Sequence, residues 1–265
     1  MRFGATNNPV KDLLSQIPEI KRKGFDYLEL CLDPPEASPE KIASLKSEIV
    51  SVMDGEGLRA EVAHLPCFVW MADMYESIRQ ASIDEVNKAL ETCRSLDIPK
   101  AVIHPGYLTG LLTRVPDMGK KLANDSLAVV LERAKEMNVT LCLENMFPRS
   151  GHMYRPEEFI DVLNAFPDVM MTVDFAHAQI QAGPGRLHQM IAAGGQRIRH
   201  VHLSDHLGKE DEHLPLGAGW VDIAGGLAAL KKLGYDDTIT LEVFSPDPAL
   251  AEHSLNKART LWEAA

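Results

Sequence analysis

The sequence has few cysteines and no long hydrophobic run. Its 265 residues contain four cysteines, Cys31, Cys67, Cys93 and Cys142, and no two of them form a C-x-x-C pair. This spacing is typical of reduced thiols in a cytosolic protein. The first ten residues, MRFGATNNPV, are too polar for a signal peptide, and no apolar run approaches the length of a membrane span. We therefore expect a cytoplasmic protein without membrane contact.

The chain also has fewer basic than acidic residues. Lys and Arg number 27 against 38 Asp and Glu, which gives a net charge of −11. A surface that binds nucleic acid needs clustered cations, so this balance disfavours a nucleic-acid partner, although a local basic groove would still be compatible with it. The hydrophobic content of 45% and charged content of 25% are ordinary globular values. A chain of this length can bury a large core without disulfides.

Eight short apolar segments alternate with eight helical segments. Pro or Ser marks several helix starts, as at Asn8-Pro9 and Ser38-Pro39, and Gly marks helix ends, as at Gly24. The predicted strands cover residues 2–6, 26–32, 58–65, 100–104, 139–144, 168–174, 199–203 and 238–244. The predicted helices cover residues 9–23, 38–57, 74–96, 116–138, 156–166, 184–195, 222–234 and 248–262.

This alternation predicts a parallel sheet, because parallel strands need long crossover connections. Eight such units close into a (β/α)8 TIM barrel of about 250 residues. No composition shift marks a boundary, so we expect one α/β domain over residues 1–265. A doubly wound open sheet is the alternative. It would usually place a glycine-rich phosphate turn after the first strand, where the sequence reads GATNN instead.

Residues 199–222 are dense in side chains that bind metals. The stretch begins with a strand in which His200 and His202 point to the same side, because side chains alternate along a strand. The loop after it carries further donors, Asp205, His206, Asp211 and His213, and a Gly217-x-Gly219 pair. Imidazole and carboxylate together suit a divalent ion such as zinc or manganese. A solvated loop that happens to be rich in His and Asp is the alternative.

The ends of the other predicted strands carry similar donors. Active-site residues of a TIM barrel lie at the carboxyl ends of its strands. The donors there are His64, His104, Glu144, Asp174 with His177, His202 with Asp211 and His213, and Glu242. Glu144 and Glu242 lie in apolar strands, where an unpaired charge is costly. An ion pair could satisfy them, but the nearby cations Arg149, Arg155 and Lys209 are all loop residues. We favour a shared metal.

Six aromatic residues fall in the loops that follow the predicted strands. Such residues either form the wall of a substrate pocket or cap the core. They are Phe68, Trp70, Tyr107, Phe147, Tyr154 and Trp220.

Taken together, these motifs resemble the xylose isomerase-like barrel superfamily, which includes sugar isomerases and epimerases and also endonuclease IV. The resemblance covers essentially the whole chain and is specific as a set. The motifs are AHLP with His64, IHPG with His104, LEN with Glu144, DFAHA with Asp174 and His177, HLSD with His202, DEHLPLGAG with Asp211 and His213, and LEV with Glu242.

The isomerase and epimerase branch implies one divalent ion, Mn, Mg, Co or Zn. The positions that would hold it are Glu144, Asp174, His202 and Glu242. In that branch the two glutamates are catalytic and move protons between adjacent carbons of a sugar, sugar phosphate or keto-polyol, through an enediolate that the metal stabilises. The remaining donors, His64, His104, His177, Asp211 and His213, would bind substrate or further metal. The resemblance also implies a role in carbohydrate metabolism and a possible homo-oligomer.

The endonuclease branch implies a different activity, the cleavage of DNA at abasic sites by a cluster of three zinc ions. All nine positions of that cluster have a compatible residue here. Against it, the DNA enzymes carry a His-x-Ser and Gly-Gly segment after the first strand and basic, aromatic loops after the second, whereas this chain reads ATNNPV and CLDPPEAS. Backbone phosphates also need cations, which the loops here mostly lack. We therefore favour sugar isomerisation or epimerisation, with the zinc-dependent phosphodiesterase as the alternative. A non-catalytic sugar-binding barrel is disfavoured because Glu144 and Glu242 are both present.

Overall fold

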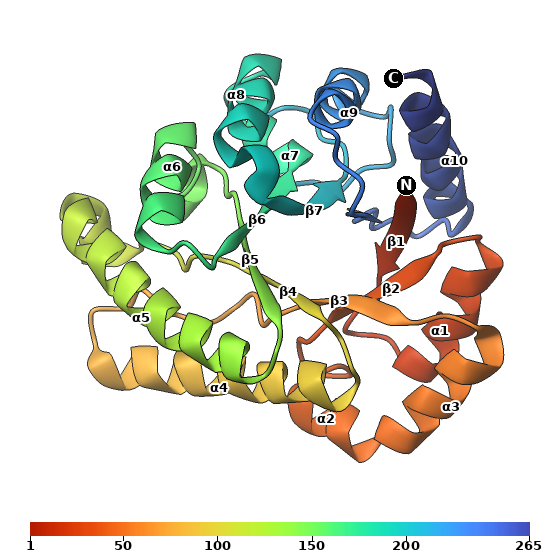
Figure 1. The fold of residues 1–265 in the computed structure, drawn as a ribbon, viewed down its shortest axis with the longest axis horizontal. Helices are drawn as coiled ribbons and strands as arrows, with labels where there is room; N and C mark the ends of the chain where they lie inside the picture. The colour runs from red at the N-terminus through yellow and green to blue at the C-terminus, as the bar shows by residue number, and fades with distance from the viewer.

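The computed structural model describes residues 1–265 and contains a closed barrel of eight parallel strands (Figure 1). The strands pair in chain order, and β8 pairs with β1 to close the ring. They are β1 (Arg2–Thr6), β2 (Tyr27–Cys31), β3 (Ala60–His64), β4 (Lys100–Ile103), β5 (Thr140–Glu144), β6 (Met170–Asp174), β7 (Ile198–Leu203) and β8 (Thr238–Leu241). This confirms the predicted (β/α)8 TIM barrel and excludes the doubly wound sheet.

Helices form a layer around the strands (Figure 1). They are α1 (Leu13–Arg22), α2 (Pro39–Ser44), α3 (Lys46–Glu56), α4 (Glu76–Ser95), α5 (Pro116–Glu136), α6 (Pro156–Ala165), α7 (Phe175–Gln179), α8 (Pro184–Gly194), α9 (Ile223–Lys232) and α10 (Ala249–Ala264). Three short 3₁₀ turns complete the set, at Gly110–Arg114, Pro148–Ser150 and Gly195–Arg197. None of the helices combines the length and the apolar composition that crossing a lipid bilayer requires.

Most predicted boundaries lie within two residues of those in the structure, but three elements differ more. The first helix begins at Leu13 and not at Pro9, because Asp12 caps it by accepting the Ser15 backbone N–H at 2.9 Å. The predicted helix 38–57 is two helices, α2 and α3, which meet at Leu45. The last strand ends at Leu241, so that Glu242 is the first residue beyond the strand.

The barrel has two cores of different character. Between the strands and the helices, aliphatic side chains form one large buried cluster that includes Leu28 and Leu30 of β2. Inside the ring, Tyr27, Val62 and Val102 form a small separate apolar cluster. The rest of the barrel interior towards the carboxyl ends of the strands is polar, which is the part of a TIM barrel where functional residues lie.

Tyr27 fills the space left by a glycine on the neighbouring strand. Its ring is fully buried, and its hydroxyl forms a hydrogen bond with Thr240 Oγ1 at 2.9 Å. A Cβ atom at Gly4 would lie 2.2 Å from Cε2 of the Tyr27 ring. Only glycine allows this packing without displacing the tyrosine.

We therefore expect Gly4→Ala to lower the free energy of unfolding by about 1–3 kcal/mol, the usual cost of overfilling a core. Gly55→Ala is the matched control, because a Cβ atom there has no heavy atom within 4 Å and Gly55 lies in helix α3. The control should gain about 0.5–1 kcal/mol from helix propensity. Urea unfolding measures both changes, and equal midpoints for the two variants would contradict the close packing at Gly4.

Candidate metal and active site

The Glu144 carboxylate lies at the centre of the predicted donors. It follows the apolar run of β5 and is 1% exposed. Its Oε2 atom lies 3.3 Å from His64 Nε2 and 3.2 Å from His104 Nε2. Its Oε1 atom lies 3.3 Å from His177 Nδ1 and 3.1 Å from His202 Nδ1. Side chains from four different strand ends therefore meet at one carboxylate.

Two further carboxylates approach the same side of His202. Its Nδ1 atom lies 3.9 Å from Asp174 Oδ2 and 3.7 Å from Glu242 Oε2. Asp174 is fully buried, whereas Glu242 keeps 8% of its surface exposed. The four residues expected to bind metal, which also include Glu144, therefore lie around one point.

The loop after β7 supplies the last two predicted donors. Asp211 Oδ2 lies 3.1 Å from His177 Nε2 and 3.0 Å from His213 Nε2. His213 Nδ1 in turn lies 3.8 Å from Glu242 Oε2. All nine residues predicted from the sequence thus belong to one connected cluster. Their individual roles stay predictions.

Local backbone structure explains how Asp174 and His177 enter the cluster together. Asp174 Oδ1 accepts the backbone N–H of His177 at 2.6 Å and so caps α7, a helix that the sequence did not predict. Asn145 binds both backbone groups of Asp174, because its amide donates to the carbonyl and accepts the N–H, each at 2.9 Å. The neighbouring ends of β5 and β6 are therefore held in register.

Asp205 and His206, part of the donor-rich stretch, do not join the cluster. The Asp205 carboxylate accepts the backbone N–H groups of His206, Gly217 and Val221 at 2.8–3.0 Å. His206 Nε2 donates to the Ala176 carbonyl at 3.0 Å. These residues shape the loop that carries Asp211 and His213, so their part is structural.

Close packing also explains a glycine in that loop. A Cβ atom at Gly219 would lie 2.3 Å from the His206 carbonyl oxygen and 2.4 Å from Asp205 Oδ1. Glycine is therefore required where the loop passes over Asp205.

The buried carboxylates have displaced pKa values. Burial raises the pKa of Asp174 to about 7, although His177 acts in the opposite direction. Burial also opposes ionisation of Glu144, but the positive charges of His202 and His104 outweigh it and hold the pKa of Glu144 well below its usual range. The two acids therefore differ in how readily they take up a proton, although they lie in one cluster.

The imidazoles mostly favour their charged form. Burial disfavours a charge on His64, but its contact with Glu144 raises the pKa of His64 to about 10. The contact with Asp211 likewise raises the pKa of His213 to about 9 against the effect of burial. His104 is the exception, because burial dominates there and lowers its pKa. The cluster therefore attracts positive charge.

The residues present fit a divalent metal ion. Asp174 Oδ2 and Asp211 Oδ1 are buried oxygens without a hydrogen-bond partner, a costly arrangement that a cation would relieve. The ligand atoms of Glu144, Asp174 and His177 lie within 4.8 Å of one another, as do those of His64, His202 and Glu242. Mixed imidazole and carboxylate ligands suit Zn, Mn or Co.

Sequence reasoning missed Glu29, a fully buried residue of β2. Its carboxylate contacts His202 Nε2 at 3.0 Å and His200 Nε2 at 2.8 Å, on the side of His202 away from the metal-type donors. A signal was available, because Glu29 lies in the apolar run YLELC just as Glu144 lies in TLCLE. The same reasoning about a buried charge would have found it.

Two of the six predicted aromatic residues border the donor cluster. The Phe147 ring lies 4.9 Å from that of His177, and the Tyr107 ring lies 6.3 Å from that of His104. Both also pack on the core.

The other predicted aromatic residues lie away from the donor cluster. Phe68 and Trp220 are 82% and 74% exposed and do not cap the core. Trp70 is also exposed, and Tyr154 stacks with Arg155 and Arg186. Phe244, which was not predicted, has its ring 4.6 Å from that of His213.

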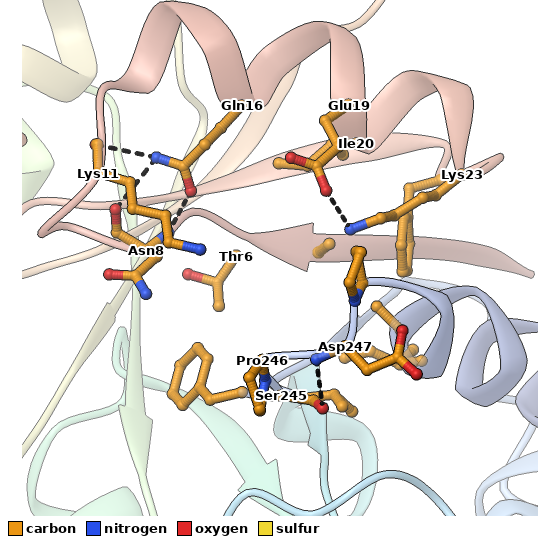
Figure 2. A pocket seen from close by; sticks show the side chains of 17 residues that line it. Thr6, Asn8, Lys11, Gln16, Glu19, Ile20, Lys23, Ser245, Pro246 and Asp247 are labelled. Atoms are coloured by element: carbon orange, nitrogen blue, oxygen red, sulfur yellow. Dashed lines mark hydrogen bonds and ion pairs between the residues drawn. The ribbon is translucent and has the colours of Figure 1, made fainter.

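A cavity of about 560 Å³ lies outside the barrel wall, between α1 and α10 (Figure 2). Lys11, Gln16 and the Glu19–Lys23 ion pair line one side, and the Ser245–Asp247 loop lines the other (Figure 2). None of the nine donors lines it. The concentration of buried ionisable groups, and not the size of this cavity, therefore identifies the candidate site.

Residues 17–261 match the family model for the xylose isomerase-like TIM barrel. The chain therefore belongs to the xylose isomerase-like TIM barrel family. An uncharacterised protein of Methanocaldococcus jannaschii is 28% identical over 251 residues, which cover 91% of this chain and 83% of that protein. An inosose isomerase of Bacillus velezensis is 26% identical over 194 residues, which cover 69% of this chain and 67% of the isomerase.

Solved structures with this fold include sugar epimerases. A D-tagatose 3-epimerase-like protein superimposes with a TM-score of 0.86 at 25% identity, covering 100% of this chain and 99% of that protein. The IOLI protein, solved with a bound zinc atom, superimposes with a TM-score of 0.77 at 20% identity, covering 98% and 96%. The similar proteins thus include isomerases and epimerases.

The raised pKa of Asp174 predicts how stability depends on pH. Its ordinary value is 3.8 and its folded value is about 7, so its neutral form is the one that the fold favours. The stability that Asp174 contributes is complete below pH 4 and is lost as the pH rises towards 7. In chelator-treated protein, the wild type should lose up to about 1.4 kcal/mol per pH unit relative to Asp174→Asn over this range.

Urea unfolding of the two proteins at several pH values measures this difference. Distant titrating groups affect both proteins alike, so the difference reports residue 174 together with His177, whose pKa the Asp174 charge raises. A constant difference between pH 4 and pH 8 would show that Asp174 is not held in its neutral form.

Proposed function

We propose that the protein is a divalent-metal-dependent isomerase or epimerase that acts on a sugar or keto-polyol. The observation that carries the proposal is the approach of two glutamates, from β5 and from the end of β8, to the same imidazole nitrogen of His202 at 3.1 and 3.7 Å. The named activities of the relatives and structural neighbours agree with this substrate class.

Glu144, Asp174, His202 and Glu242 would hold the metal ion. Bound there, a divalent ion would polarise a substrate carbonyl and stabilise negative charge on its oxygen. The unpartnered Asp174 Oδ2 and the raised pKa values of the surrounding imidazoles support a cation at this point.

The two glutamates differ in ways that suit proton transfer. Glu242 is the more exposed of the two, and its nearest imidazoles lie at 3.7 and 3.8 Å, beyond hydrogen-bond distance. Its carboxylate is therefore free to take a proton from a substrate carbon. Glu144 is buried among four imidazoles, and three of them, His64, His177 and His202, have raised pKa values and so hold protons beside it. Epimerisation and ketose isomerisation both need such a pair of groups.

His177 and His213 would orient the substrate. Asp211 holds both imidazoles through their Nε2 atoms, so their ring planes are fixed. The Phe147 and Phe244 rings pack against these two imidazoles and supply apolar surface beside them. A sugar ring, which has both hydroxyl groups and C–H faces, matches such a mixed wall.

Solvent deuterium exchange tests the proposed reaction. With Mn²⁺ bound, the wild type should wash deuterium from D₂O into the carbon beside the carbonyl of at least one member of a panel of keto sugars and inososes. Glu144→Gln and Glu242→Gln should each lower the exchange rate about 10²–10⁴-fold, because a proton-transfer group is removed.

Glu210→Gln is the matched control for this measurement. Glu210 is an exposed glutamate of the loop after β7 and pairs only with Arg149, so its variant should exchange at the wild-type rate. Mass spectrometry reads the incorporated label. Absence of exchange with every sugar, in protein that has metal bound, would contradict the proposal.

Abasic-site cleavage is the second candidate, and the convergence of all nine donors favours it. The two activities need different metal contents. Elemental analysis of the purified protein should find one divalent ion per chain if it is an isomerase or epimerase, whereas three zinc ions would favour the nuclease. Incubation with abasic duplex DNA and Zn²⁺ completes the comparison, and we expect no strand cleavage, because the net charge of −11 opposes binding to phosphates.

A further inference from the structure

Glu29 and His200 form a buried polar group beneath the candidate metal site. Glu29 is 0% exposed and lies in the interior of the barrel, between β7 and its own strand. His200 and His202 are also 0% exposed and lie on the same face of β7. Three ionisable side chains without solvent contact need a specific arrangement of hydrogen bonds.

The direction of those hydrogen bonds follows from Lys100, the first residue of β4, at the amino-terminal end of the barrel. The Lys100 ammonium group can only donate, and it donates to Thr238 Oγ1 at 2.8 Å and to Asp237 Oδ1 at 2.6 Å. The Thr238 hydroxyl hydrogen is then available for His200 Nδ1 at 2.8 Å. His200 therefore has its own proton on Nε2, which donates to Glu29 Oε2 at 2.8 Å.

The same reasoning fixes His202. An ionised Glu29 can only accept, so His202 must donate from Nε2 to Glu29 Oε1, which lies 3.0 Å away. The Nδ1 atom of His202 is thereby the one presented to Glu144, Asp174 and Glu242. When a metal displaces the Nδ1 proton, His202 held in this way directs a lone pair at the point where three carboxylate oxygens meet.

Glu29, His200 and His202 could themselves be read as a metal site, because their ligand atoms lie close together. Their hydrogen bonds argue against this. Each bond is 2.8–3.0 Å long, as expected for a shared proton, and none of the three side chains has a buried atom without a partner. The unpartnered buried carboxylate oxygens belong instead to Asp174, on the Nδ1 side of His202, and to Asp211.

We propose that Glu29 is a positioning residue for the metal site, which fixes the tautomer and ring orientation of His202, and that His200 anchors Glu29 for this task. This inference rests on the proposed function, because it assigns His202 to a metal. Metal-ligating imidazoles commonly donate their second N–H to a carboxylate, and loss of that partner typically lowers metal affinity 10–100-fold.

Calorimetric titration with Co²⁺ tests the inference without depending on catalysis. Chelator-treated wild type should bind Co²⁺ and develop visible absorption bands. Glu29→Gln should raise the dissociation constant about 10–100-fold and shift those bands, because the charge that fixes the His202 ring is lost. Glu61→Gln is the matched control, since Glu61 lies on the next strand and pairs with Arg2 instead of an imidazole. It should bind Co²⁺ as the wild type does.

The outcomes separate this inference from the proposed function. If the wild type binds Co²⁺ and Glu29→Gln binds it with the same affinity and spectrum, the positioning role is overturned and the proposed function stands. If the wild type itself takes up no Co²⁺, the proposed function fails and the inference fails with it. If Glu29→Gln does not fold, Glu29→Asp replaces it. Its carboxylate is one methylene shorter, so affinity should fall at least 10-fold, and an unchanged affinity would overturn the role.

Discussion

Attraction between the buried Glu144 carboxylate and the imidazoles around it is the interaction on which the candidate site depends. A charge at 1% exposure would be prohibitively costly alone, yet four imidazole nitrogens lie within 3.3 Å of it. Each imidazole belongs to a different strand end or loop, so the geometry exists only when the barrel has closed. The contacts around Glu144 therefore depend on the closed barrel, and they also help to hold its strand ends together.

The separation of an aliphatic outer core from a polar barrel interior allows the fold to bury these charged side chains. Aliphatic residues between the strands and the helices supply the apolar burial that stabilises the fold. The interior of the ring is consequently free to hold polar groups, from Lys100 and Thr238 at one end, through His200 and Glu29, to the donor cluster at the other. Most barrels of this type fill their interior with branched aliphatic residues. Here Tyr27, Val62 and Val102 are the small apolar cluster that remains.

The wall of the barrel separates two very different environments near β8. Glu242 faces the donor cluster, whereas its neighbours Leu241 and Val243 line the cavity between α1 and α10. Alternation of side chains along an extended segment produces this separation. The outer cavity has room for a small molecule, but the buried ionisable groups that make chemistry possible are on the inner side.

The amino-acid sequence by itself determined the barrel, because eight apolar segments separated by helical crossovers have few other ways to bury their surfaces. It also determined which strand ends carry donors, and all nine of those predicted came together. What it could not determine were features set by contacts between distant segments. The caps at Asp12 and Asp174 moved or added helices, and the Asp205 and His206 side chains turned to backbone groups instead of the site. The partner of Glu29, His202, lies 173 residues away in the sequence and is identified only in the folded chain. The sequence shows that a carboxylate in an apolar strand needs a compensating group, but it does not show which group that is.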